Sequence, residues 1–185
     1  MISLGLCQRI DSTASEGFFL NGSSYATLPE GLKLEPGSLI GFSFRTCLPG
    51  ELLRQNGDGL DELKLFLDAQ GRLVLHIASD DVRSEAVVEA GLLDSRWHTV
   101  FLAVNPETND LTVNVSNGGG SAVLSGSALR SLNLSSPQLV VGSGMVACLR
   151  EGPGVEFSRR GVSSAGVAWL APGQTCLLPS TCSGT

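Results

Sequence analysis

Apolar and polar side chains alternate with a period of two along most of this chain, in short runs that turn residues separate. In residues 39–44, for example, Ile40, Phe42 and Phe44 alternate with Leu, Gly and Ser, which predicts a strand with one buried face. A strand with one apolar face needs a second layer that removes this face from water. The alternation therefore predicts an all-β chain, folded as a two-sheet antiparallel β-sandwich.

We expect about ten strands, with connections of only a few residues between them. The 23 glycines and 8 prolines are spread through the chain and supply tight turns. The predicted strands lie within residues 17–28 (two runs around Asn21-Gly22), 37–46, 51–56, 61–68, 72–79, 86–91, 97–104, 111–116, 121–126 and 137–144. Residues 128–133 read as a short helix. The predicted core consists of Phe42, Phe44, Leu65, Leu67, Leu73, Leu75, Val100 and Leu102.

Charge and hydropathy exclude several classes of partner. The formal net charge is −6, and the only lysines are Lys33 and Lys64. Nucleic acids and heparin bind clustered cations, so we expect neither as a partner. No apolar run approaches 18 residues, and we expect no membrane insertion by this segment. The first residues, MISLGLC, do not resemble a signal peptide, so a secreted protein would contain this chain as a fragment.

Cysteines and sequons indicate an extracellular or cell-surface setting. Five cysteines without a CxxC pair, together with two histidines, disfavour a structural zinc site. The odd cysteine count implies a free thiol or a partner outside this fragment. Three N-x-S/T sequons predict glycosylation at Asn21, Asn114 and Asn133. Sequons together with sparse cysteines are typical of extracellular proteins.

Five motifs follow one another in a recognisable order. They are IGFSFRTCLPGELL (40–53), LKLFLDAQGRLVLHI (63–77), LLDSRWHTVFLAV (92–104), LTVNVSN (111–117) and LVVGSGMVACLR (139–150). In this order and spacing, they resemble a laminin G-like domain, also called the laminin–neurexin–sex-hormone-binding-globulin domain. The resemblance covers residues 17–176 and implies a jelly-roll, concanavalin-like sandwich.

The resemblance also implies a domain organisation. Residues 17–178 would form the laminin G-like domain. Residues 1–16 would be a linker or the end of a preceding module. Residues 179–185 would be a linker or the start of a following module, such as an epidermal-growth-factor-like repeat.

The resemblance implies a disulfide between Cys148 and Cys176. Cys7 and Cys182 lie outside the matched region, where they either pair with each other or belong to flanking cysteine-rich modules. Cys47 stands where the family usually has a polar turn residue. It would then be the odd cysteine, either buried and inert or a functional thiol.

Many laminin G-like domains bind one calcium ion at the rim of the sandwich. By resemblance, Asp61 would supply a carboxylate, with Asp58 as an alternative, and the carbonyl of Ala78 would be a further ligand. A side chain of Asn133 or Ser135 would complete the set, since calcium prefers oxygen ligands from several segments. A plain solvated acidic turn is the alternative, and a glycan on Asn133 would compete with the metal.

Residues that could carry catalysis do not form a known constellation. A catalytic His98 would need a nucleophile and an orienting acid, and the chain has neither G-x-S-x-G nor a Glu-x-Asp-x-x-Glu strand. We expect Trp97 to fill the core at a strand start and His98 to point across the sheet edge. We therefore expect no enzyme but a recognition or adhesion module, which binds a protein or glycan through rim loops. The alternatives are a structural spacer and a carrier of a small apolar ligand.

Overall fold

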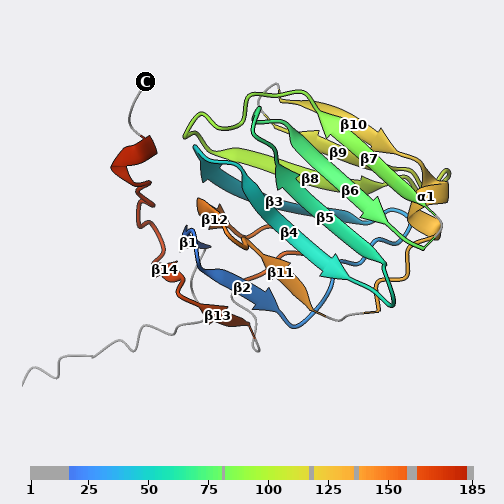
Figure 1. The fold of residues 1–185 in the computed structure, drawn as a ribbon, viewed down its shortest axis with the longest axis horizontal. Coiled ribbons are helices and arrows are strands. Elements are labelled where there is room, and N and C mark those ends of the chain that lie inside the picture. Colours follow the sequence, from blue (N-terminus) through green and yellow to red (C-terminus); the bar gives the residue numbers. More distant parts are fainter. Residues whose placement is uncertain (1–16, 81, 117–118, 136–137, 158–161, 183–185) are drawn as a thin grey trace, which may run out of the picture.

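The computed structural model describes residues 17–80, 82–116, 119–135, 138–157 and 162–182, which form two packed antiparallel sheets (Figure 1). One sheet, called here the β3 sheet, has the strand order β10-β9-β8-β3-β12-β1-β14, and the other, the β4 sheet, has the order β13-β2-β11-β4-β5-β6-β7. This arrangement confirms the predicted all-β sandwich. No helix among the described residues is long and apolar enough to cross a membrane.

The strands and helices follow one another in the order given by their labels. They are β1 (Gly17–Asn21), β2 (Tyr25–Leu28), β3 (Leu39–Thr46), β4 (Gly50–Asn56), β5 (Glu62–Leu67), β6 (Leu73–Ala78), β7 (Arg83–Val88), β8 (His98–Val104), β9 (Leu111–Val115), β10 (Gly120–Leu124), α1 (Gly126–Arg130), β11 (Leu139–Val141), β12 (Val146–Arg150), β13 (Ser163–Ala165), β14 (Ala168–Leu170) and a 3₁₀ turn (Ser180–Cys182).

Most predicted strands are confirmed, with three differences. The strand predicted at residues 86–91 is β7, which begins at Arg83 because its first three residues already pair with β6. These residues are polar, so the apolar alternation did not reveal them. The predicted helical stretch is α1, which begins two residues before the predicted start at residue 128. Strands β12, β13 and β14 were not predicted. β13 and β14 have three residues each, too few to show an alternation, and β12 is buried at three successive positions, so that it shows no alternation either.

The inward faces of the two sheets form one apolar core. All eight predicted core residues are buried, with relative exposures of 0–2 %. Their neighbours in this core include Phe18, Leu20 and Leu63. Burying one such side chain is worth roughly 1.5–3 kcal/mol, so the contact between the sheets is the main source of stability.

A second, smaller apolar cluster lies on the outer face of the β3 sheet. Its buried members are Cys148, Leu170 and Cys176, and Phe19, Trp97 and Leu178 pack against it. The prediction that Trp97 fills the core is therefore wrong. His98 instead lies beside the core residue Phe44, with 5.7 Å between the ring centroids. Trp97 faces outward because side chains of successive residues alternate at the start of β8, and the Arg150 guanidinium lies 4.2 Å from its ring centroid.

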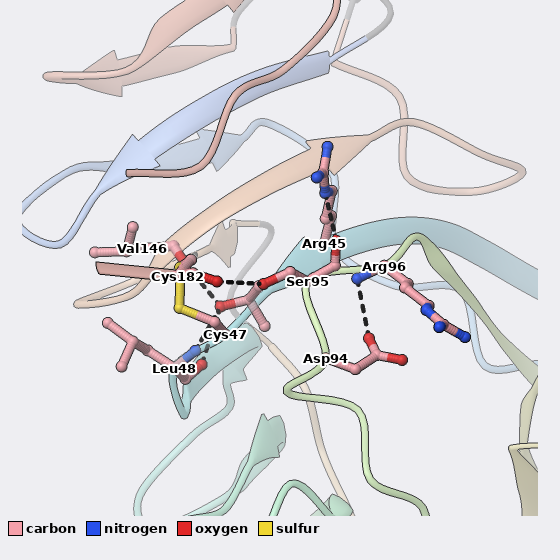
Figure 2. Close-up of a disulfide and its surroundings, with 9 residues drawn as sticks. Arg45, Cys47, Leu48, Asp94, Ser95, Arg96, Val146 and Cys182 are labelled. Atoms are coloured by element: carbon pink, nitrogen blue, oxygen red, sulfur yellow. Dashed lines mark hydrogen bonds between the residues drawn. A yellow bond between two sulfur atoms is a disulfide. The ribbon is translucent and has the colours of Figure 1, made fainter. Parts of the chain in front are cut away.

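Residues 171–182, called here the C-terminal strap, cross this outer cluster after β14. The predicted disulfide Cys148–Cys176 is confirmed, and a second disulfide joins Cys47 to Cys182 (Figure 2). Neither alternative for Cys182 is therefore correct, and Cys47 is not the odd cysteine. Cys7 lies outside the described residues. The second disulfide attaches the chain to the sandwich beyond the boundary expected at residue 178.

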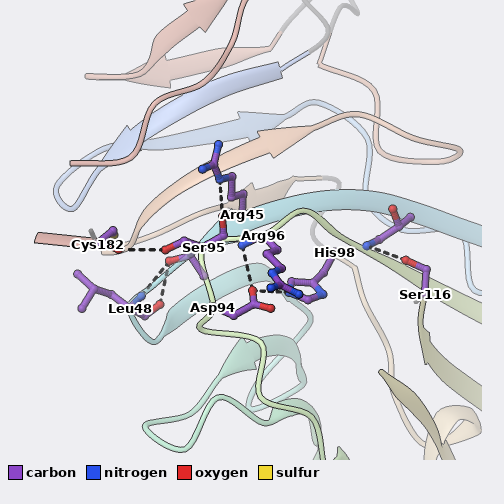
Figure 3. A network of polar contacts seen from close by, with 10 residues as sticks. Arg45, Leu48, Asp94, Ser95, Arg96, His98, Ser116 and Cys182 are labelled. Carbon is purple, nitrogen blue, oxygen red and sulfur yellow. Dashed lines mark hydrogen bonds and ion pairs between the residues drawn. The ribbon is translucent and has the colours of Figure 1, made fainter. Parts of the chain in front are cut away.

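The loop that precedes β8 connects the strap to the sheet. The Ser95 N–H donates to the Thr46 carbonyl at 2.9 Å, and the Ser95 carbonyl accepts from Arg45 Nε at 2.6 Å. A second Arg45 nitrogen, Nη1, donates to the Cys176 carbonyl at 3.2 Å. Ser95 has a positive φ of 62°, which non-glycine residues adopt at a cost. The Arg45 contacts hold the loop between β3 and the strap, and Figure 3 shows the contact with Ser95.

Asp94 in the same loop fixes the conformation of the residues between itself and the start of β8. Its Oδ1 lies 2.7 Å from His98 Nε2 and accepts the Arg96 N–H at 2.9 Å (Figure 3). Partial burial raises the pKa of Asp94, but the hydrogen bonds from His98 and Arg96 lower it, and the net pKa is below the usual 3.8.

Removing the Cys47–Cys182 disulfide should destabilise the domain strongly. The two cysteines are 135 residues apart, and the chain-entropy model gives roughly 4–5 kcal/mol for a loop of this size. We expect Cys47→Ser/Cys182→Ser to melt about 10 °C or more below the wild type in calorimetry. Equal melting temperatures would mean that the disulfide does not constrain the unfolded chain.

The hydrogen bond between Asp94 and His98 should make the free energy of unfolding depend on pH in the acidic range. Folding lowers the pKa of Asp94. Asp94 therefore adds its full contribution to the free energy of unfolding at pH values above the usual aspartate pKa, and it loses this contribution as the pH falls through its lower pKa in the folded state. Asp94 is about one-third exposed, so we expect Asp94→Asn to lose only about 0.5–1 kcal/mol at pH 7. Urea unfolding at pH 7 and at pH 2.5 should show this difference shrinking at the lower pH. If the wild type and Asp94→Asn differ by the same free energy of unfolding at both pH values, the lowered pKa of Asp94 does not contribute to stability.

Candidate functional site

Three separate segments meet at one end of the sandwich, at the right in Figure 1. They are the turn between β4 and β5 (57–61), the turn between β6 and β7 (79–82) and the segment after α1 (131–135). The antiparallel register pairs Glu62 with Ala78 and Ala78 with Arg83. It therefore brings the β4–β5 turn and the β6–β7 turn to the same end of the sheet. We call this end the rim. Residue 81 is outside the described part of the chain.

Hydrogen bonds from the first turn to the third segment organise the rim. Asp61 Oδ2 accepts the Asn133 N–H at 2.6 Å, and Asp58 Oδ1 accepts the Ser135 hydroxyl at 2.6 Å. The Asn133 side chain and main chain both contact Asp58, through Nδ2 to Oδ2 at 3.4 Å and through the carbonyl to the Asp58 N–H at 3.3 Å. The two carboxylates therefore bridge residues more than 70 positions away in the sequence.

The glycines of the sequence NGDGLD make this approach sterically feasible. A Cβ atom on Gly57 would lie 1.9 Å from the Asn133 carbonyl oxygen, and Gly59 has a φ of +63°. The Gly57 N–H donates to the Asp61 carbonyl at 2.6 Å and closes the turn. Larger residues at either position would move the carboxylates away from Asn133.

A polar hollow of about 550 Å³ opens beside Asp61. Ala78, His76 and Arg83 line it together with residues of the first turn. Leu60, with a relative exposure of 68 %, stands at its edge. Ser79 is 8 % exposed, and its hydroxyl donates to Ser131 at 3.4 Å, which connects the second turn to the third segment.

The structure brings the predicted calcium ligands together. Asp61, Asn133 and Ser135 belong to the hydrogen-bonded rim, and Ala78 lines the same hollow as Asp61. Asp58, considered as an alternative to Asp61, lies beside it and takes part in the same network. Sequence reasoning missed Leu60, because a single exposed leucine in a turn has no pattern that distinguishes it.

The donors at the rim are carboxylate, amide, hydroxyl and carbonyl oxygens, which are the ligand types that calcium prefers. Among the described residues, however, no group of three or more histidine, cysteine, aspartate or glutamate side chains could hold a metal. A calcium ion would thus need neutral oxygens in addition to Asp58 and Asp61. The ion would also replace the hydrogen bonds that these carboxylates accept now.

A second hollow, of about 290 Å³, lies where β2 ends and β3 begins. Leu28, Leu39 and Ile40 supply apolar walls, and Glu30 and Lys33 supply charges. The nearby Gln55 is buried and accepts the Leu32 N–H at 2.7 Å, which fixes the loop that forms this hollow. Because the hollow opens at the end of the sandwich, its position differs from the space between the sheets that a carrier of apolar ligands would use.

The three sequons occupy different surfaces. Asn21 ends β1, and its side-chain carbonyl accepts the Ser23 N–H at 3.1 Å. Asn114 lies in the middle of β9, and Asn133 belongs to the rim network. A glycan on Asn133 would cover the rim, whereas glycans on the other two would leave it open.

No protein-family model matches the sequence, and no curated protein sequence matches it. Solved structures do match. The pair of domains LG4-5 of the mouse laminin alpha1 chain has a TM-score of 0.56 and 22 % identity, over 85 % of this chain and 42 % of that one. The LG1-3 region of the laminin alpha2 chain has a TM-score of 0.63 and 14 % identity, over 85 % and 35 %.

A bacterial structure is similar as well. The module CBM40 of the Ruminococcus gnavus IT-sialidase has a TM-score of 0.52 and 16 % identity, over 73 % of this chain and 88 % of that one. The chain spans less than half the length of the two laminin structures. At these identities the comparisons concern the fold, and they agree with the resemblance read from the motifs. The chain has a laminin G-like fold.

Proposed function

We propose that this chain is a non-catalytic extracellular binding module that recognises a protein or glycan partner through its rim. The observation that carries this proposal is the polar hollow of about 550 Å³, which is lined by the turn between β4 and β5 and by the β6–β7 hairpin. The segment after α1 holds these two turns through hydrogen bonds to Asp61 and Ser79. Concave sites with a few convergent polar groups are the usual binding sites of proteins. The exposed Leu60 at the edge offers an apolar contact next to them.

The disulfides and the structural neighbours support the extracellular setting and the class of partner. Disulfides persist in oxidising compartments, and two of them join cysteines in the part of the chain that the structure describes. The neighbours include laminin domains and a carbohydrate-binding module, which was also solved bound to alpha2,3 sialyllactose, with a TM-score of 0.51 and 15 % identity. A rim that binds protein or glycan is in keeping with both.

Calcium is a further part of this proposal. Asp58 and Asp61 would hold the ion, and Asn133, Ser135 and the Ala78 carbonyl would supply neutral oxygens. When bound, calcium would neutralise the two carboxylates and offer a charged contact to an acidic or hydroxylated partner. The chain's own residues would keep the turn 57–61 in place through Gly57 and Gly59.

Binding should depend on the rim and not on exposed leucines elsewhere. We would stain mammalian cells with the tetramerised domain, and we expect Leu60→Ser to reduce staining at least fivefold. Leu177→Ser is the matched control, because Leu177 is 76 % exposed in the strap. Treating cells with protease or with glycosidases distinguishes a protein from a glycan partner. Staining by Leu60→Ser equal to that by the wild type would exclude the rim as the binding site, and no staining by the wild type would favour the spacer.

Calcium should raise the melting temperature through Asp61. A ligand present at a hundredfold excess over its Kd stabilises the native state by about 2.7 kcal/mol. We expect millimolar calcium to raise the melting temperature of the wild type, measured against chelator. Asp61→Ala and Asp61→Asn should both abolish the rise, although asparagine can still accept the Asn133 N–H.

Glu89→Ala is the matched control for this measurement. Glu89 is an exposed acid next to Arg72, at the opposite end of the sandwich. It should respond to calcium as the wild type does. If calcium does not stabilise the wild type, the ion is removed from the proposal and Asp61 remains a hydrogen-bonding residue of the turn.

A further inference from the structure

Asn114 is an unusual residue for its position. It lies in the middle of β9, paired with β8 on one side and β10 on the other. Asparagine is depleted in strands, and the Asn114 side chain makes no hydrogen bond to the described part of the chain. Its neighbours Val113 and Val115 are buried in the core, so Asn114 points away from the core, onto the outer face of the β3 sheet. Packing does not account for this asparagine.

An aromatic side chain stands directly opposite Asn114. The register pairs Asn114 with Phe101 on β8 and with Ser121 on β10. Residues opposite each other in an antiparallel pair have their Cβ atoms about 4.5–5.5 Å apart, and their side chains share one face. Phe101 is partly exposed there, although it is a large apolar residue.

Gly41 on β3 provides room for the Phe101 ring. A Cβ atom on Gly41 would lie 2.8 Å from Phe101 Cδ1 and 2.9 Å from its Cε1. The ring therefore extends from β8 over β3, along the surface of the sheet. The ring thus leans away from β9, and because Phe101 is only partly buried, a group attached to Asn114 would have to extend over β8 to cover it.

We propose that Asn114 carries an N-linked glycan and that the first N-acetylglucosamine of this glycan packs on Phe101. Asn114-Val115-Ser116 is an N-x-S sequon. A sugar ring attached to Asn114 Nδ2 is within reach of the opposite residue, and its C–H groups favour the negative face of an aromatic ring. The glycan removes the exposed part of Phe101 from water.

The modification needs a donor from the secretory pathway. A lipid-linked diphospho-oligosaccharide supplies the glycan: a bond forms between Asn114 Nδ2 and the sugar C1, and the bond from C1 to the diphosphate breaks. The amide loses one proton and the lipid diphosphate leaves. The inference thus rests on the proposed extracellular function, because the chain must pass through that pathway.

The experiment separates the first sugar from the rest of the glycan. The chain is secreted, behind a leader, from mammalian cells treated to keep glycans in the high-mannose form. Glycopeptide mass spectrometry should find Asn114 occupied. Endoglycosidase H leaves one N-acetylglucosamine and should not change the melting temperature. Peptide-N-glycosidase F removes this sugar as well and should lower the melting temperature by about 2–4 °C.

Variants test whether the drop in melting temperature comes from Phe101. Peptide-N-glycosidase F converts Asn114 to aspartate, so Asn114→Asp is the control for the added charge. The drop should persist in Asn21→Gln, which removes another sequon. It should vanish in Phe101→Thr, and also in Phe101→Leu, which keeps an apolar residue if threonine impairs secretion. An unmodified Asn114 would overturn the proposal, as would an equal drop without Phe101 or a drop after endoglycosidase H.

The deglycosylation experiment at Asn114 can fail or succeed independently of the staining experiment at the rim. The staining that tests Leu60 does not involve Asn114, which lies on the outer face of the β3 sheet. If Asn114 is unmodified and Leu60→Ser still reduces staining, only the glycan proposal fails. If Asn114 is occupied and Leu60→Ser has no effect, only the proposed function fails.

Discussion

The contact between the two apolar sheet faces determines the position of almost every other residue in this domain. Because side chains alternate along a strand, burying Phe42 and Phe44 directs Ser43 and Arg45 outward. A slip of one residue would bring polar groups into the core, so the register is strongly fixed. The outward positions of Asn114 and Cys148 follow from the same constraint on their buried neighbours.

The outer face of the β3 sheet shows how a short segment can cover a sheet face that carries only a small apolar cluster. The strap contributes little to the core, and two disulfides hold it against β12 and the end of β3. Beneath it, carbonyl groups of Ser95 and Cys176 accept the hydrogen bonds of Arg45. The covalent links thereby add to the small apolar contact that the strap makes with the sheet.

The segments of the rim are held together by hydrogen bonds to charged carboxylates and not by burial of apolar side chains. Two carboxylates in one turn accept hydrogen bonds from Asn133 and Ser135, and such charge-assisted bonds are stronger than neutral ones. The rigid strands fix the ends of the turns, while the turns supply exposed groups. A stable scaffold with polar loops at one end is well suited to recognition, because loops can vary without disturbing the core.

The period-two pattern predicted the sandwich, most strands and the eight core residues, because burial of one strand face leaves a regular trace in the sequence. The motif order also led to Cys148–Cys176 and to residues that do meet at the rim. Sequence could not assign Cys47 to Cys182 or place Trp97 outside the core. These features depend on which segments from distant parts of the chain become neighbours, and only the packing of the two sheets and the path of the strap decide that.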